Sequence, residues 1–260
     1  MLNLSKSVKI SKIASAAAVI SVLSFGATIA QAGTIVGSKH DLGTGGDSQL
    51  TGQTTTEVCV FCHTPHGSDT TAVVPLWNKK LDAAPTYTLY SSLGTSTLDG
   101  DEAAVGSVSL ACLSCHDGTQ AMDAVLNTPG SGGYNASGAN LGDGTKMSNA
   151  VGNVIPMLGA DLTNDHPIGI EYGAQTDDSA AYVPMDSATI NGSVQYWVNS
   201  KGNEAVTGRQ KNDIILYDRG DGTARVECAS CHDPHNGGAT TVFLRIANDN
   251  SDVCLSCHVK

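Results

Sequence analysis

Hydrophobic positions in this chain occur in short runs rather than in long periodic stretches. Apolar residues over Val194–Val198, Ile214–Tyr217 and Ala224–Val226 predict short strands, and a glycine-rich turn joins the last two. No helical period continues over many residues. Residues 117–227 are rich in Gly, Ser, Asn and Asp, a composition typical of loops. We therefore expect a mainly irregular, coil-rich fold with short helices and a few short strands.

The longest apolar run lies near the amino terminus and predicts a signal peptide over residues 1–32. Three lysines precede the apolar run Ile13–Gly26, and Ala30-Gln31-Ala32 supplies small residues for cleavage before Gly33. A membrane anchor is the alternative, but this run is interrupted by serines and is shorter than the ~20 residues that cross a bilayer. We expect an exported protein whose mature chain, residues 33–260, has no membrane span.

The composition shows that the mature chain is acidic and poor in large aromatic side chains. The 260 residues include 29 Gly but only 3 Phe and 2 Trp, so aromatic side chains supply little of the apolar volume that a core needs. Removal of residues 1–32 takes three of the 14 basic residues, so 11 remain against 25 acidic ones, a formal charge of −14. Such a charge disfavours nucleic acid and anionic membranes as partners.

All 8 cysteines fall into four C-x-x-C pairs, and a histidine directly follows each pair. C-x-x-C-H is the attachment motif of c-type haem, in which two thiols form thioethers to one porphyrin edge and the imidazole ligates the iron. Zinc sites and redox disulfides also use C-x-x-C, but neither requires this histidine. The sequence predicts four covalent haems, attached through Cys59, Cys62, Cys112, Cys115, Cys228, Cys231, Cys254 and Cys257, with His63, His116, His232 and His258 as proximal iron ligands.

Four haem irons need four sixth ligands, and the chain has four histidines besides those of the motifs. We expect all of them to be distal ligands, so that every haem is bis-histidyl. Methionine is the alternative sixth ligand, but the methionines after the signal peptide share no recurrent sequence context. The predicted distal ligands are His40, His66, His166 and His235.

Two of these histidines are tied to attachment motifs. His66 follows His63, and His235 follows His232, each within three residues that include a proline. The axial ligands of one iron lie on opposite faces of the porphyrin, and so short a segment does not reach round its edge. Each should therefore ligate a different haem, which brings haems close together.

The remaining two distal candidates have acidic neighbours. Asp41 follows His40, and Asp165 precedes His166. A carboxylate so placed either orients a ligating imidazole or caps a turn, and the sequence favours neither. Asp-rich stretches at residues 99–102 and 218–221 do not match the spacing of an EF-hand loop, so we interpret them as solvated turns rather than calcium sites.

The motifs recur in the same order along the chain. A C-x-x-C-H-x-Pro-His unit followed by a Cys-Leu-Ser-Cys-His unit occurs over residues 59–116 and again over 228–258. Similar residues follow the first unit each time, Thr70–Trp77 and Thr240–Leu244. This repeat predicts a single tetrahaem domain over residues 33–260, organised by stacked haems, with short helices carrying the attachment motifs.

The chain resembles the doubled-CXXCH multihaem c-type cytochromes. The segments that carry this resemblance are Lys39–Leu42, Glu57–Gly67 with Pro75–Asn78, Asp165–Gly169 and Cys231–His235. Its size and four motifs are similar to those of OmcE-type tetrahaem cytochromes, which polymerise into extracellular filaments. That resemblance implies a homopolymer in which one axial histidine ligates a haem of the neighbouring subunit. Because only Val259 and Lys260 follow the fourth motif, its haem needs cover from upstream segments or from another subunit, and His40 and His66 are the best candidates to cross.

The leading functional hypothesis is an electron conduit outside the cell or at its surface. A soluble periplasmic tetrahaem carrier is the alternative, and both need redox donor and acceptor partners. A multihaem reductase would need an iron with an exchangeable position. Eight histidines fill eight axial positions here, so we expect no enzymatic activity.

Overall fold

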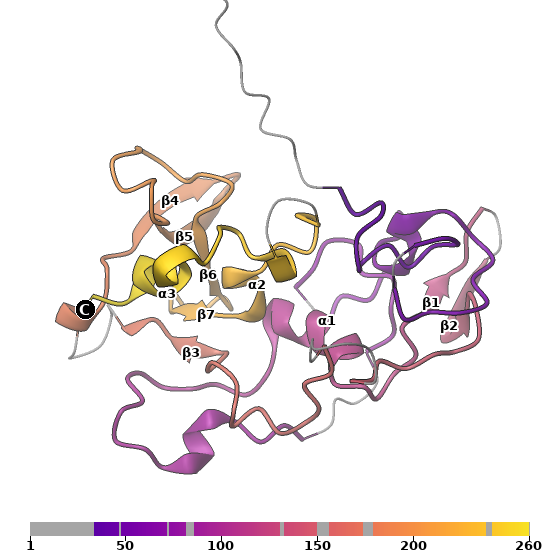
Figure 1. Ribbon diagram of the computed structural model, residues 1–260, viewed down its shortest axis with the longest axis horizontal. Helices are drawn as coiled ribbons and strands as arrows, with labels where there is room; N and C mark the ends of the chain where they lie inside the picture. Colours follow the sequence, from indigo (N-terminus) through magenta and orange to yellow (C-terminus); the bar gives the residue numbers. More distant parts are fainter. Residues whose placement is uncertain are drawn as a thin grey trace, which may run out of the picture. The chain divides into compact units, whose positions relative to one another are not determined.

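The computed structural model describes most of the chain after the amino-terminal segment (Figure 1). All of these residues belong to one compact unit, Ala32–Lys260. The signal peptide predicted for residues 1–32 lies outside the part described. The described residues are 34–46, 48–71, 73–81, 86–130, 133–149, 156–173, 179–237 and 241–259.

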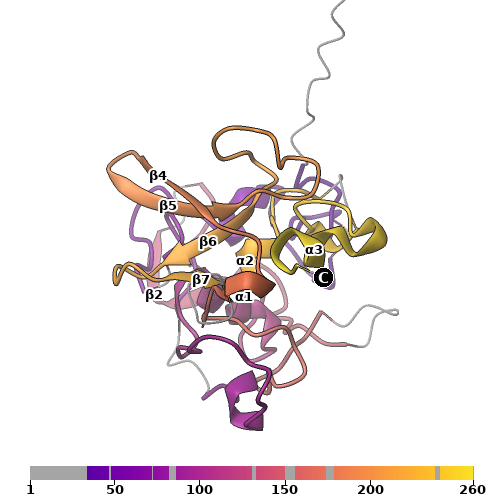
Figure 2. The ribbon, with the colours of Figure 1, turned by 90° about the vertical axis from the view of Figure 1, so that its left-hand side faces the viewer.

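The larger of two antiparallel sheets has five strands in the order β3-β7-β6-β5-β4. They are β3 (Ile170–Glu171), β4 (Asp186–Ile190), β5 (Ser193–Val198), β6 (Ile214–Asp218) and β7 (Ala224–Val226). Strands β5, β6 and β7 confirm the three strands predicted from the apolar runs. Strand β4 lies at the edge of the sheet, with every residue exposed, and pairs with β5 in a hairpin (Figure 2).

A hydrophobic cluster lies on one face of this sheet. Ile214 and Leu216 alternate along β6 and pack with Val198 and with residues of β3 and β7. Ile215 points to the opposite face, where it is paired with Trp197 of β5 and is also buried. Burial on both faces explains why β6 reads as a continuous apolar run rather than as an alternation.

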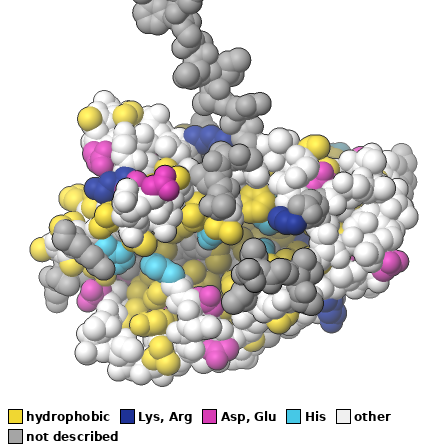
Figure 3. All heavy atoms as spheres, in the orientation of Figure 1, with side chains coloured by type: hydrophobic (Ala, Val, Ile, Leu, Met, Phe, Trp, Pro, Cys, Tyr) yellow, Lys and Arg dark blue, Asp and Glu magenta, His cyan; other side chains and the backbone are white. Residues whose placement is uncertain are grey.

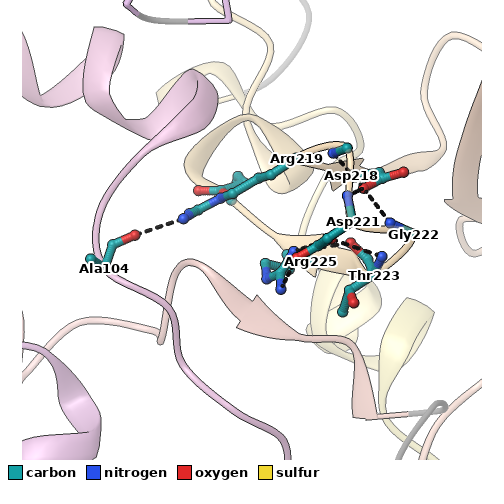
Figure 4. Close-up of polar contacts among 9 residues, drawn as sticks. Ala104, Asp218, Arg219, Asp221, Gly222, Thr223 and Arg225 are labelled. Carbon is teal, nitrogen blue, oxygen red and sulfur yellow. Dashed lines mark hydrogen bonds and ion pairs between the residues drawn. The ribbon is translucent and has the colours of Figure 1, made fainter.

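Local turn chemistry fixes the two hairpins of the sheet. Between β4 and β5, Asn191 and Gly192 both have positive φ, 51° and 82°, as a tight two-residue hairpin turn requires. Between β6 and β7, Asp218 Oδ1 accepts the backbone N–H groups of Gly220, Asp221 and Gly222 (Figure 4). This Asp-rich segment is therefore a turn. The described residues contain no cluster of acidic and histidine side chains that could hold a metal ion.

A smaller sheet pairs β1 (Ala124–Asn127) with β2 (Tyr134–Asn140). The register between the strands shifts once, between Val125 and Asn127. Val125 is fully buried and belongs to a second hydrophobic cluster, together with Leu42, Leu50, Phe61, Met122 and Leu141. This sheet therefore anchors the amino-terminal half of the described chain in its own core.

The helices are short. As predicted, short helices lie at the attachment motifs: α1 (Ser107–His116), α2 (Cys228–Cys231) and α3 (Asp252–Cys257) each contain both cysteines of a motif, whereas η1 (Val58–Phe61) contains Cys59 and ends directly before Cys62. None of the helices in the described segments is long and apolar enough to cross a membrane. Among the described residues there are also short 3₁₀ turns, namely η2 (Tyr90–Leu93), η4 (Ser179–Ala181), η5 (Thr241–Phe243) and η6 (Asp249–Ser251).

The predicted fold class, a mainly irregular chain with short attachment helices and a few short strands, is wrong. The described part of the chain forms two antiparallel sheets with seven strands in total. Gly, Asn and Asp in residues 117–227 were interpreted as loops, whereas Asn191-Gly192 and Asp218–Gly222 are the turns of β-hairpins. The segment therefore builds a sheet with a hydrophobic core of its own, rather than long connections between haem sites.

Candidate haem-attachment sites

Each C-x-x-C-H motif closes a single helical turn. The backbone N–H of the histidine donates to the carbonyl of the first cysteine at 2.8 Å for His63, 3.2 Å for His232 and 2.9 Å for His258, and His116 is the last residue of α1. Positions three and four apart lie on one face of such a turn. Both thiols and the imidazole of one motif can therefore approach the same side of a planar group.

The eight cysteines are free thiols, and each motif has a cysteine close to one of the next motif. Cys62 lies within electrostatic range of Cys115. The thiols of Cys112 and Cys228 interact directly, and this contact together with burial raises the pKa of Cys112. Cys231 is similarly close to Cys257. The attachment sites are thus neighbours in the order in which they occur along the sequence.

Burial keeps several of these thiols in the neutral form. It raises the pKa of Cys62 and of Cys257 to about 12, and that of Cys231 to about 11. Cys62 and Cys115 pack against the hydrophobic cluster around Phe61, and Cys257 packs against the core of the larger sheet. The cysteines therefore line apolar surroundings, which suit a large apolar ring system.

In two pairs of histidines, the ring centres are separated by nearly the same distance. The ring centres of His63 and His235 are 6.1 Å apart with planes 15° from parallel, and those of His40 and His116 are 6.2 Å apart with planes at 77°. A metal–imidazole bond of about 2.0 Å, plus about 1.1 Å from nitrogen to ring centre, separates two imidazoles on one metal by about 6.2 Å. Both pairs therefore have the spacing of axial ligands on one iron.

The second nitrogen of most of these rings is engaged by the backbone. With Nδ1–H donated to a carbonyl, Nε2 carries the lone pair that binds a metal. Burial lowers the pKa of His40 to about 4 and also lowers that of His116, so both rings are neutral at pH 7. The Nδ1 contacts are His63 to Pro75 O at 2.7 Å, His116 to Pro156 O at 2.6 Å, His232 to Val242 O at 2.9 Å, His40 to Pro234 O at 3.3 Å and His166 to Pro167 O at 2.9 Å.

The first and third motifs are held by the same hydrogen-bond pattern. Beyond the Pro75 contact of His63, Thr64 N–H donates to Leu76 O at 2.8 Å and Asn78 N–H to Cys62 O at 2.9 Å. Leu76 has a positive φ of 57°. In the third motif the corresponding bonds are His232 Nδ1 to Val242 O, Asp233 N–H to Phe243 O and Arg245 N–H to Cys231 O, and Phe243 has a φ of 58°. We call Pro75–Asn78 and Val242–Arg245 the two clamp segments.

The remaining predicted ligands have other neighbours. The ring of His258 packs against Tyr182, with centres 5.0 Å apart. The carbonyl of His66 accepts a hydrogen bond from Asn127 of β1, which places this residue beside the smaller sheet. The structure thus brings two of the four predicted distal histidines opposite a proximal one, while His66 and His166 face none among the described residues. Histidines lie among hydrophobic side chains on the face shown in Figure 3.

Of the two acidic neighbours, Asp41 is a turn residue. Its carboxylate accepts the backbone N–H of Gly37 at 2.8 Å and of Gly43 at 3.2 Å. His40 instead contacts Pro234 O, and its ring stacks on Phe243 with centres 4.2 Å apart. A carboxylate does contact one distal candidate, because Asp233 Oδ1 lies 3.3 Å from Nδ1 of His235, and this contact lowers the pKa of Asp233 to about 2.

Sequence reasoning missed the polar groups that join the attachment helices. Glu227, whose side chain is fully buried, precedes Cys228 and accepts hydrogen bonds from Ser109 of α1 at 2.6 Å and from Arg219 at 2.7 Å. Arg219 also donates to Ala104 O at 2.7 Å (Figure 4). The equally buried Lys79 was also overlooked. Their partners are distant in sequence, so no local pattern signals them.

Part of the chain matches a known family model. No curated protein matches the chain. The family model described as "Doubled CXXCH motif" matches residues 222–260, which contain the third and fourth motifs with α2 and α3. The motifs indicate covalent haem c and electron transfer, and residues 222–260 are a multihaem c-type cytochrome-like region.

Proposed function

We propose that this protein is a tetrahaem cytochrome that transfers electrons and is not an enzyme. The facing pairs His63–His235 and His40–His116 carry the proposal, because each has the spacing of two imidazoles on one iron. The four C-x-x-C pairs would form the thioethers, with His63, His116, His232 and His258 as proximal and His40, His66, His166 and His235 as distal ligands. When bound, each haem supplies one iron that accepts and releases a single electron.

The contacts between motifs support transfer along a row of sites. Cys62 with Cys115, Cys112 with Cys228, and Cys231 with Cys257 hold the four attachment edges next to one another. The His235 ring, three residues beyond its own motif, faces His63 of the first motif. One polypeptide segment therefore serves two attachment sites, which keeps those sites close and leaves little freedom between them.

We further propose that the protein works outside the cytoplasm as a conduit that polymerises, like the OmcE-type filaments it resembles. His40 faces His116 of its own chain, so of the two histidines expected to cross, His66 is the better candidate. It lies beside β1, whereas the fourth motif is on α3, and Figure 1 shows these elements on opposite sides of α1 and α2. A head-to-tail contact would bring His66 of one chain to the fourth haem of the next.

Purification of the native protein tests these proposals in order. Mass spectrometry should show four covalent haems per mature chain, and a chain without haem would overturn the electron-transfer proposal. Electron microscopy of cell-surface material should show filaments, which the variant His66→Ala abolishes while keeping four haems. Monomers alone would leave a periplasmic carrier as the function. Carbon monoxide should not bind the fully reduced protein, whereas binding at one haem per chain would favour a reductase.

A further inference from the structure

Lys79 is a buried cation held entirely by the backbone. Lys79 is 2 % exposed, and its Nζ donates hydrogen bonds to the carbonyl oxygens of Ala121, Met122 and Ala124 at 3.2, 2.9 and 2.9 Å. A carbonyl oxygen accepts but never donates, so all three contacts need an N–H from the lysine. Only the ammonium form has three such donors. The hydrogen bonds therefore fix a positive charge at this point.

This charge lies between the first two attachment sites. The neighbouring Asn78 donates its backbone N–H to Cys62 O at 2.9 Å and its side-chain amide to Val60 O at 2.6 Å, which joins the lysine segment to the first motif. The three carbonyls that bind Lys79 belong to the segment that follows His116 of the second motif. Met122 also packs in the cluster that touches both Cys62 and Cys115.

Negative groups near the lysine do not cancel its charge by direct pairing. Among the described residues, no carboxylate forms an ion pair with Lys79. Asp123 is fully buried in the same segment as the three carbonyls, and its Oδ2 accepts the backbone N–H of Gly144 at 3.1 Å rather than a hydrogen bond from Lys79. The charge of Lys79 also acts on Cys62, where it opposes the effect of burial on the thiol.

We propose that Lys79 raises the reduction potentials of the two haems attached at Cys59–Cys62 and Cys112–Cys115. Reduction adds one electron to each iron, and no proton is needed to balance it. A fixed cation in low-dielectric surroundings stabilises the site that has gained this negative charge. The inference rests on the proposed haem attachment and predicts that electrons reside preferentially on the amino-terminal pair of haems.

Potentiometric titration with haem-resolved NMR tests the inference in the four-haem protein. In the wild type, the first two haems should become reduced at higher potential than the third and fourth. Lys79→Met should lower the potentials of these two haems and leave the other two within error. Lys79→Gln, which keeps two amide donors for the carbonyls, should do the same if the methionine variant does not fold.

Lys80→Met is the matched control, because this adjacent lysine is exposed and carries the same charge. It should move the potentials far less, since water screens an exposed charge. Unchanged potentials in a folded Lys79 variant, or a wild type whose first two haems are the last to be reduced, would overturn the inference. A wild type that carries no haem would instead refute the proposed function itself.

Discussion

Ser109 Oγ donates a hydrogen bond to Glu227 Oε2 at 2.6 Å and accepts the backbone N–H of Cys228 at 3.0 Å. One hydroxyl of α1 is thereby bonded to the first residues of α2. Ser109 and Glu227 are both buried, and Arg219 neutralises the carboxylate from the other side. This contact lies beside the interacting thiols of Cys112 and Cys228, so it helps to set how the second and third attachment sites meet.

Replacing Glu227 should therefore weaken the whole domain. We expect Glu227→Ala to lower the free energy of unfolding by about 3–5 kcal/mol, because removal of one partner from a buried pair leaves the other uncompensated. Chemical denaturation followed by circular dichroism measures this. Glu57→Ala is the control, since Glu57 lies two residues before Cys59, the first cysteine of another motif, but is exposed. Equal effects of the two variants would contradict the structural role of Glu227.

His235 offers a direct test of which iron it binds. In His235→Ala, one haem should become five-coordinate and high-spin, and haem-resolved NMR should identify it as the haem at Cys59–Cys62, because His235 faces His63. Added imidazole should restore the low-spin signal, and His235→Met should restore six ligands at a higher potential. A change confined to the haem at Cys228–Cys231 would show that the histidine serves its own motif.

The turn between β6 and β7 should make stability depend on pH. Hydrogen bonds from Arg225 and from the backbone of Thr223 lower the pKa of Asp221 below its ordinary value of 3.8. A carboxyl whose pKa is lowered by folding stabilises the fold above its unfolded pKa, and this contribution is lost as the pH falls.

Asp221→Asn should consequently be less stable than the wild type at pH 6, and the difference should shrink as the pH falls below about 4. Thermal unfolding across this range at low salt would measure it. Asp249→Asn, at an exposed carboxylate, should show no such trend. A difference that is constant over the whole range would exclude the ionised contact as its cause.

The β4–β5 hairpin gives a test of the larger sheet. Gly192 has φ +82° and nothing within 4 Å of the position of an added Cβ, so Gly192→Ala introduces backbone strain without a clash. We expect a loss of about 1–2 kcal/mol in unfolding free energy, the cost of a left-handed conformation for an L-residue. Ser193→Ala in the same hairpin should be close to neutral. A neutral Gly192→Ala would indicate that the hairpin adds little to stability.

The sequence predictions that the structure confirms rest on local patterns of residues. The helical turn at each attachment motif follows from the spacing of Cys59, Cys62 and His63, and β6 follows from the apolar run at Ile214–Leu216. The β4–β5 hairpin was missed, although Asn191-Gly192 between Ile190 and Ser193 is a recognised hairpin signal. Asn and Gly are also common in loops, so composition alone does not distinguish a hairpin turn from a loop.

The parts of the site that could not be predicted depend on contacts between distant segments. The facing of His40 and His116 depends on how the chain folds between them, and Lys79 reads as an ordinary charged residue until its three carbonyl partners are brought around it. Burial of such groups is decided by tertiary packing, since lysine and glutamate are rarely buried without partners. No spacing rule anticipates it.

The clamp segments place the second nitrogen of His63 and His232 against Pro75 O and Val242 O, which are main-chain atoms. A carbonyl of the main chain neither titrates nor disappears when a side chain is exchanged. Orientation of these imidazoles should thus tolerate wide drift in residue type at both positions and should not change with acidity. Insertions and deletions, which shift the carbonyl out of reach, are the genetic changes to which this part of the protein is vulnerable.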